Sequence, residues 1–194
     1  MGKDAGRVGL GVPDGKGQGH DEDVVLKIVS DGSPLAPYAQ LASELVMSAS
    51  EVHACVKRAQ TCHLLHGFQL NHRPNIAAVE EFLVHGLYYI FPSERGELTR
   101  GVPTSYPAEP LRSLIAPGTE PMPVWAITDG DVRGVSFAPL YKTAPIAALR
   151  DSCFHAYLAL ADALRAGRAR ERKLAEAALH KRLRATDGPR KHLT

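Results

Sequence analysis

Cysteine and aromatic residues are scarce in this chain of 194 residues, which has three cysteines and in which Phe, Trp and Tyr together make up 6%. An odd number of cysteines, in a chain long enough to bury its own core, excludes the disulfide framework that holds small secreted domains together. Long apolar runs are also missing, because no stretch approaches the roughly 18 residues that a membrane-spanning helix needs. These absences predict a cytoplasmic protein with reduced thiols and no membrane partner.

Charge of either sign is nearly balanced over the whole chain, with a net charge of +2, but it is unevenly distributed. Residues 165–194 hold ten basic residues against three acidic ones, whereas the rest of the chain has 13 basic and 18 acidic residues. An acidic body with a basic C-terminal arm suits an anionic partner. A solvated helix followed by a charged tail has the same composition, so both interpretations stay open.

Glycine is concentrated in residues 1–20, which hold seven of the 17 glycines and few apolar side chains. Such a segment cannot bury enough apolar surface to fold, so we predict that it is disordered. Gly11, Gly15, Lys16 and Gly17 look like part of a phosphate-binding loop, but the spacing is one residue short and no Ser or Thr follows the lysine. The sequence therefore excludes a nucleotide site there.

Residues 21–61 have the pattern of three short amphipathic helices. The first begins at a run of three acidic residues, which complement the positive end of a helix. The third begins at Ser48, because Ser48 and Glu51 have the spacing of a capping box. The expected helices cover residues 21–31, 37–45 and 48–61.

The third of these helices is expected to have one buried and one exposed face. At about 100° per residue, the buried face holds Val52, Cys55, Val56 and Ala59. Hydroxyls, an imidazole and two cations then point outward, where they can donate hydrogen bonds to DNA bases and phosphates. The candidate DNA-binding residues are Ser48, Ser50, His53, Lys57, Arg58 and Thr61.

Residues 41–53 read LASELVMSASEVH and match the pattern LA..LGMS.S.V except at the glycine. The segment resembles the helix-turn-helix of winged-helix bacterial transcriptional regulators of the MarR-like kind, over about residues 21–70. The resemblance implies that the third helix lies in the major groove of DNA. Val46 takes the place of the usual turn glycine, so we expect a different turn geometry, because a β-branched residue tolerates positive φ poorly. Only residues 64–70 stand where a long wing hairpin is expected.

Beyond residue 70 the sequence predicts both helices and strands. Asn75 is predicted to cap a helix that ends near Gly86. Residues 87–91 are predicted to form a strand whose aromatic side chains lie in the core. Nine prolines between residues 92 and 145 make long helices unfavourable there. The clearest element of that region is a hairpin, with strands at residues 124–127 and 132–137 and a turn at 128–131.

Two helices are expected near the C-terminus. Asp151 is predicted to cap the first, whose apolar stripe includes Tyr157, Ala161 and Leu164, and Gly167 interrupts the helical pattern. The helix that follows is polar and its apolar stripe is thin, so it needs a surface to pack on. A homodimer through these C-terminal helices would provide one.

Neither a metal site nor an active site is predicted. Cysteines and histidines cluster between residues 55 and 72, but without the spacing of a closed zinc site. Asp129 and Asp131 lie in the predicted turn, and Cys153 and His155 would point apart on a helix. We therefore expect no cofactor and no enzymatic activity.

The sequence predicts an α+β, mainly α fold in four parts. Its function is predicted to be that of a DNA-binding transcriptional regulator, a repressor that acts by promoter occupancy. The alternative is an antitoxin-like protein or complex subunit that docks protein through the winged helix. The parts are a disordered tail at residues 1–20, a winged helix-turn-helix domain at 21–92, a partner-binding or dimerisation domain at 93–184 and a basic tail at 185–194.

Overall fold

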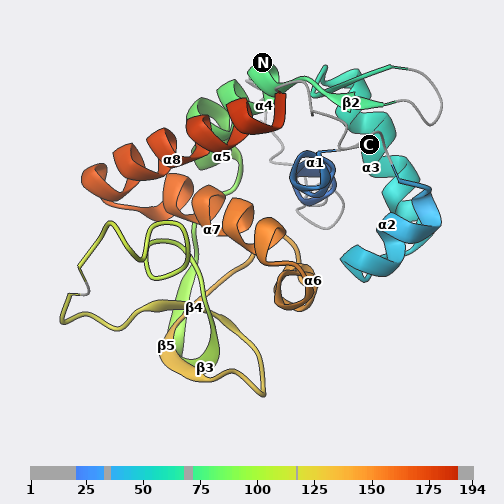
Figure 1. Ribbon diagram of the computed structural model, residues 1–194. Coiled ribbons are helices and arrows are strands. Elements are labelled where there is room, and N and C mark those ends of the chain that lie inside the picture. Colours follow the sequence, from blue (N-terminus) through green and yellow to red (C-terminus); the bar gives the residue numbers. More distant parts are fainter. Residues whose placement is uncertain (1–20, 33–35, 68–71, 117, 188–194) are drawn as a thin grey trace, which may run out of the picture.

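Figure 1 shows the computed structural model, which describes residues 21–32, 36–67, 72–116 and 118–187. The fold is α+β and mainly helical. Its central element is helix α1 (Asp21–Asp31), which lies between a pair of N-terminal helices on one side and a pair of C-terminal helices on the other. The predicted disorder of residues 1–20 and most of the predicted basic tail lie outside the described residues. The flanking helices are α2 (Tyr38–Leu45), α3 (Ala49–Thr61), α7 (Ser152–Ala166) and α8 (Ala169–Asp187).

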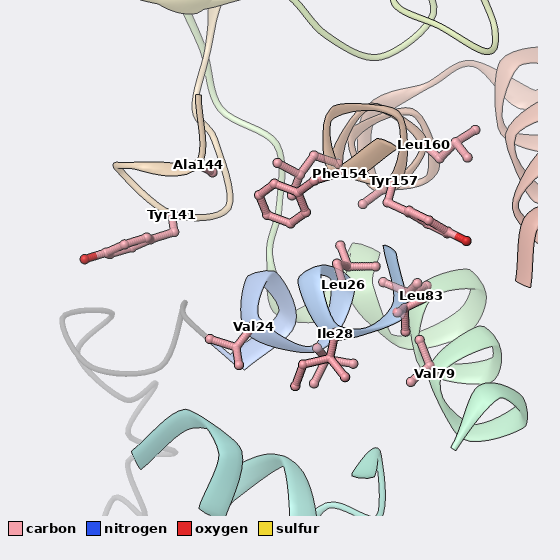
Figure 2. Packing of buried hydrophobic residues seen from close by; sticks show 14 of the residues in the cluster. Val24, Leu26, Ile28, Val79, Leu83, Tyr141, Ala144, Phe154, Tyr157 and Leu160 are labelled. Atoms are coloured by element: carbon pink, nitrogen blue, oxygen red, sulfur yellow. The ribbon is translucent and has the colours of Figure 1, made fainter. Parts of the chain in front are cut away.

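Helix α1 is buried along almost its whole length, from Glu22 to Val29. In Figure 2, Leu26 lies on the side of α1 that faces α7, whereas Ile28 lies on the side toward α3. The same hydrophobic cluster runs without a break from Val24 in α1 to Leu183 in α8. The domain boundary predicted at residue 92 is therefore not marked by a gap in the core.

Three helix starts follow the predicted capping pattern. Ser48 begins α3 with a complete capping box. The Asn75 side chain accepts a hydrogen bond from the Ala78 amide at the start of α4 (Ile76–Glu81). The Asp151 carboxylate accepts from the amides of Cys153 and Phe154 at the start of α7, directly after α6 (Ala144–Arg150). These predictions are confirmed because each cap is a local contact, set by residues two or three positions apart.

The prediction of a strand at residues 87–91 is wrong. Helix α4 continues through a π-helical segment, η1 (Phe82–Gly86), into α5 (Leu87–Ile90). The backbone amide of Leu87 bonds to the Phe82 carbonyl, so the helical ladder passes through Gly86 instead of ending there. Tyr88 and Tyr89 are exposed, at 47% and 81%, and do not lie in the core. Local β-propensity is overridden here by the helix that is already running.

The strands form two small sheets. Strands β1 (Leu65–His66) and β2 (Arg73–Pro74) pair antiparallel. The other three close into a small barrel in which β3 pairs antiparallel with both β4 and β5, and β4 pairs parallel with β5. The barrel strands are β3 (Arg95–Pro103), β4 (Pro123–Ala126) and β5 (Val132–Phe137).

The expected antiparallel hairpin between β4 and β5 is therefore wrong, although both strands exist. Glycines allow the backbones of this barrel to lie closer together than side chains would permit. A Cβ on Gly130 would lie 2.3 Å from the Gly101 Cα atom. A Cβ on Gly134 would lie 2.1 Å from the Met122 carbonyl oxygen. Because backbones approach this closely only where side chains are missing, β4 can pair parallel with β5 while β3 pairs with both strands.

A buried polar cluster joins this barrel to α7. The Asp162 carboxylate accepts hydrogen bonds from Thr104 Oγ1 at 2.6 Å and from Trp125 Nε1 at 2.8 Å. It also accepts from Arg165 Nε at 2.9 Å, one turn along α7. Every oxygen of this buried carboxylate thus has a donor, which fixes the barrel against the helical layer.

The C-terminal helices pack on each other within one chain. Tyr157, Ala161 and Leu164 of α7 are all buried, so the stripe expected to face a partner helix is already covered. Helix α8 lies along α7 and buries Ala175, Leu179 and Leu183. The surface that the thin stripe of α8 needs is therefore supplied inside the chain. No helix in the described ranges combines the length and apolar character needed to cross a membrane.

Candidate nucleic-acid interface

The turn between α2 and α3 has a left-handed residue at Val46, with φ 57° and ψ 47°. The expectation of a different geometry at this position is therefore wrong: Val46 occupies the left-handed conformation that glycine would favour. The Val46 amide bonds to the Ala42 carbonyl and closes the end of α2. A β-branched residue in this conformation costs about 1–2 kcal/mol, which the surrounding contacts must offset.

Ser48 is engaged in starting α3. Its Oγ accepts a hydrogen bond from the Glu51 amide at 3.2 Å, and its own amide donates to Glu51 Oε2 at 2.9 Å. Ser50 Oγ lies 3.0 Å from Ser48 Oγ. These bonds fix the first turn of α3 on an exposed surface and leave Ser50 at its edge.

The two faces of α3 are separated as predicted. Val52, Cys55, Val56 and Ala59 are buried, each at 1% exposure or less. Ser50, His53, Lys57 and Thr61 are all exposed and follow one another at helical spacing on the opposite side. We call these four residues the α3 stripe. Within it, the His53 ring packs edge-on against Tyr38 of α2, and Thr61 Oγ1 donates to the Lys57 carbonyl.

Arg58 does not stand free beside the stripe, which corrects the expectation of two outward cations. Its guanidinium makes a bidentate ion pair with Asp21 of α1, with Nη2 2.7 Å from Oδ1 and Nε 2.9 Å from Oδ2. The hydrogen bonds to Asp21 raise the pKa of Arg58. Arg58 Nη2 also lies 3.4 Å from the Cys55 sulfur, so the side chain fastens α3 to α1.

Sequence reasoning missed Arg73 and His66, which pair across the β1–β2 hairpin and are both exposed. The hairpin contacts α3 and follows it directly in the chain. Its second strand lies beyond residue 70, where the predicted wing ends, so the prediction leaves out Arg73. The Arg-Pro sequence at residues 73–74 after a run rich in histidine gave too weak a strand signal to find it.

Two buried carboxylates at the start of α1 have oxygens without a hydrogen-bond donor among the described residues. Within the described ranges, both oxygens of Asp23 and Oε2 of Glu22 accept no hydrogen bond. Burial raises the pKa of Glu22 from its ordinary 4.5 to about 7. Burial, together with the nearby carboxylates of Glu22 and Asp162, also raises the pKa of Asp23. These groups favour their protonated forms, so they carry less negative charge than the sequence implies.

Lys27 of α1 lies in a cluster of three carboxylates. Its ammonium is 2.7 Å from Asp31, 3.0 Å from Glu44 of α2 and 2.8 Å from Asp151 at the start of α7. Burial alone would lower the pKa of Lys27, but the hydrogen bonds to these carboxylates raise it. A lysine that stays protonated cannot act as a nucleophile or a base, so the cluster fastens three helices together.

The other reactive side chains are dispersed. Among the described residues, no group of three or more His, Cys, Asp or Glu side chains is placed to hold a metal ion. Cys55 is buried on the inner face of α3, whereas Cys62 is exposed at the end of this helix. The His155 ring bonds through Nε2 to the Pro103 carbonyl oxygen, whereas the Cys153 thiol bonds to the Ser30 carbonyl oxygen. Among the described residues, the two side chains therefore do not form a thiol–imidazole pair.

The comparisons with known proteins do not extend this description. No protein-family model matches the chain, and neither a curated protein nor a solved structure matches it. The geometry of α3 and its neighbours is therefore the basis for assigning a function.

Proposed function

We propose that the chain binds double-stranded DNA through α3 and represses transcription in the bacterial cytoplasm by occupying a promoter. The observation that carries this proposal is the α3 stripe. Its four polar side chains are exposed on one face of a helix whose opposite face is fully buried. The stripe holds two hydroxyls, one imidazole and one ammonium, which are groups that bond to base edges and phosphates.

The dimensions of α3 suit this role. From Ser50 to Thr61 the stripe rises about 16 Å at 1.5 Å per residue. The major groove is about 12 Å wide and admits a single α-helix. Helix α2 packs against α3 and presents Tyr38 beside His53, so the pair has the arrangement of a helix-turn-helix. The left-handed Val46 supports the same assignment.

The β1–β2 hairpin extends the proposal to a winged helix. It takes the position that a wing would have, directly after α3, and it exposes Arg73. We assign Arg73 to a phosphate contact beside the groove, because an exposed guanidinium binds phosphate oxygens without reading sequence. Among the described residues of this surface, the lysine and arginine side chains outside any ion pair are then Lys57 and Arg73, whereas Arg58 is held by Asp21.

The neutralisation of Arg58 also favours a second candidate, in which α3 docks protein. A protein-docking helix needs fewer cations than a DNA-reading helix, because phosphate contacts supply much of the affinity for DNA. In this alternative the chain is an antitoxin-like protein or a complex subunit. The two candidates differ in one measurable property, since only DNA binding releases counterions from phosphates.

The test uses a fluorescent duplex selected from a random-sequence library by the full chain. Lys57→Ala should weaken binding by about 1–3 kcal/mol if Lys57 contacts a base. Lys173→Ala, on the exposed side of α8, removes the same charge far from α3 and should leave the affinity unchanged. Equal losses in both variants, or no enrichment of any duplex, would move the assignment to protein docking.

A further inference from the structure

Helix α8 lies on the other side of α1 from α3 (Figure 1). A groove of about 490 Å³ runs along α8. One wall is the turn that carries Pro110 and Leu114, and the other is α8 itself. Leu114 is 51% exposed although it is a large apolar side chain. The apolar side chains of α8 that line the groove are Leu174, Ala177, Ala178 and Ala185.

This lining is a second apolar stripe on α8, distinct from the one that packs on α7. The first stripe holds Ala175, Leu179 and Leu183, which are all fully buried. The groove stripe runs from Leu174 to Ala185 at helical spacing and rises about 16 Å, or three turns. On the opposite flank of α8, His180 pairs with Glu80 of α4, so that side is already occupied. The groove stripe is the apolar face of α8 that nothing in the described chain covers.

The charge around the groove is positive. Lys181 and Arg182 belong to its lining, and the lining includes no acidic residue. The exposed Arg112 lies on the turn beside Leu114, while the exposed Glu109 precedes Pro110 and is the acidic residue at that end. Arg182 also lies over the Tyr157 ring, at 5.9 Å from its centroid, so Lys181 is the cation free to meet a partner.

We propose that this groove docks an amphipathic, acidic α-helix of a partner protein. Apolar side chains spaced three and four residues apart would fill the space between Leu114 and α8, as in other helix-in-groove complexes. Glu or Asp residues flanking that stripe would pair with Lys181 at the rim. A DNA backbone would gain nothing from the apolar floor, and a second copy of α8 would bring like charge against Lys181.

The docked helix would leave the α3 stripe open, because α8 and α3 lie on opposite sides of α1 (Figure 1). The chain could then hold a partner and DNA together. This inference stands on the groove alone and does not require α3 to bind DNA. Lys57→Ala should therefore leave groove binding intact, so failure of the DNA proposal and failure of this one are distinguishable.

The experiment measures the fluorescence anisotropy of two synthetic helical probes added to the full chain. Both probes carry the same leucine stripe, but one is flanked by glutamates and the other by lysines. The acidic probe should bind more tightly than the basic one. Lys181→Glu should weaken the acidic probe about tenfold, because a like charge then faces its glutamates. Lys173→Glu makes the same charge change on the exposed side of α8, outside the groove lining, and should have little effect.

A second variant tests the apolar wall without changing charge. Leu114→Ser should weaken the acidic probe while leaving the melting temperature near that of the wild type, because Leu114 is half exposed. Equal binding of the two probes, absence of binding, or displacement of the acidic probe by duplex DNA would each overturn the proposal. So would a concentration-dependent dimer that Leu114→Ser dissociates, since the occupant would then be a second copy.

Discussion

Arg58 of α3 and Asp21 of α1 are joined by a bidentate ion pair across 37 positions of sequence, with three nitrogen-to-oxygen distances of 2.7, 2.9 and 3.1 Å. The pair lies beside the α3 stripe, and the Arg58 side chain is 41% exposed. It therefore holds a cation at the edge of the proposed DNA surface and neutralises it there. The strength of DNA binding should depend on the state of this pair.

Asp21→Asn should release Arg58 to phosphate. We expect the variant to bind a selected duplex more tightly than the wild type, with a salt dependence steeper by about one released ion. The free energy of unfolding should fall by about 1 kcal/mol, because a partly exposed ion pair and a helix-start charge are lost together. Anisotropy titrations at several salt concentrations and urea denaturation measure the two effects. An unchanged salt slope would show that Arg58 stays away from phosphate even when free.

Val46→Gly should stabilise the protein by about 1 kcal/mol, because glycine adopts positive φ without the strain of a β-branched side chain. The Val46 side chain is 38% exposed, so little buried apolar surface is lost. Thermal melting should show a rise of a few degrees. Val46→Ala is the control and should give a smaller gain, since alanine keeps a Cβ in the same conformation. A lower melting temperature for Val46→Gly would contradict the strain at this turn.

The stability of the protein should fall as the pH rises through the pKa of Glu22. The folded-state pKa is about 7 and the ordinary value is 4.5, so the folded chain holds a proton that the unfolded chain releases. The stabilising effect is complete below pH 4.5 and is lost as the pH passes 7. The loss from Glu22 is about 3 kcal/mol, and the raised pKa of Asp23 acts in the same direction.

Glu22→Gln should remove the part of this pH dependence that Glu22 contributes, because the amide does not titrate, and should leave the part that comes from Asp23. Denaturation curves of both proteins between acid and alkaline pH provide the measurement. Glu81→Gln, on an exposed carboxylate, should leave the wild-type profile unchanged. A profile that Glu22→Gln does not flatten would mean that another buried group governs it.

The three thiols should divide into two that react and one that does not. Cys62 and Cys153 are exposed, whereas Cys55 is fully buried on the inner face of α3, and burial raises its pKa to about 12. An aromatic disulfide reagent should therefore titrate two thiols in the native protein and three in denaturant. Rapid reaction of all three would show that α3 is rotated or readily detaches from α1.

Sequence reasoning succeeded where contacts are local. The capping box of Ser48 and Glu51, and the burial of Val52 and Val56, follow from spacing along one helix, and the structure confirms them. Sequence reasoning failed where the position of a side chain depends on a partner that is distant in the sequence. Nothing near Arg58 indicates Asp21 as a partner, because an acidic residue at the start of a helix already has a local explanation.

The same limit explains the errors in the strands and in α5. Two β-rich segments joined by a short turn predict a hairpin, but the pairing of β3 with both of them depends on glycine contacts from another part of the chain. Leu87–Ile90 has aromatic residues typical of a strand, yet it continues a helix that Asn75 begins. The function of α3 as a DNA-binding helix stays a prediction that the proposed measurements test.

The carboxylates around Lys27 have a consequence for how related sequences can differ. Asp31, Glu44 and Asp151 bring three negative charges toward one ammonium, so the cluster keeps an excess of negative charge. A neutral residue at position 27 would leave these carboxylates to repel one another across three helices. We therefore expect evolution to change position 27 only together with at least one of positions 31, 44 and 151, so that these four sites covary.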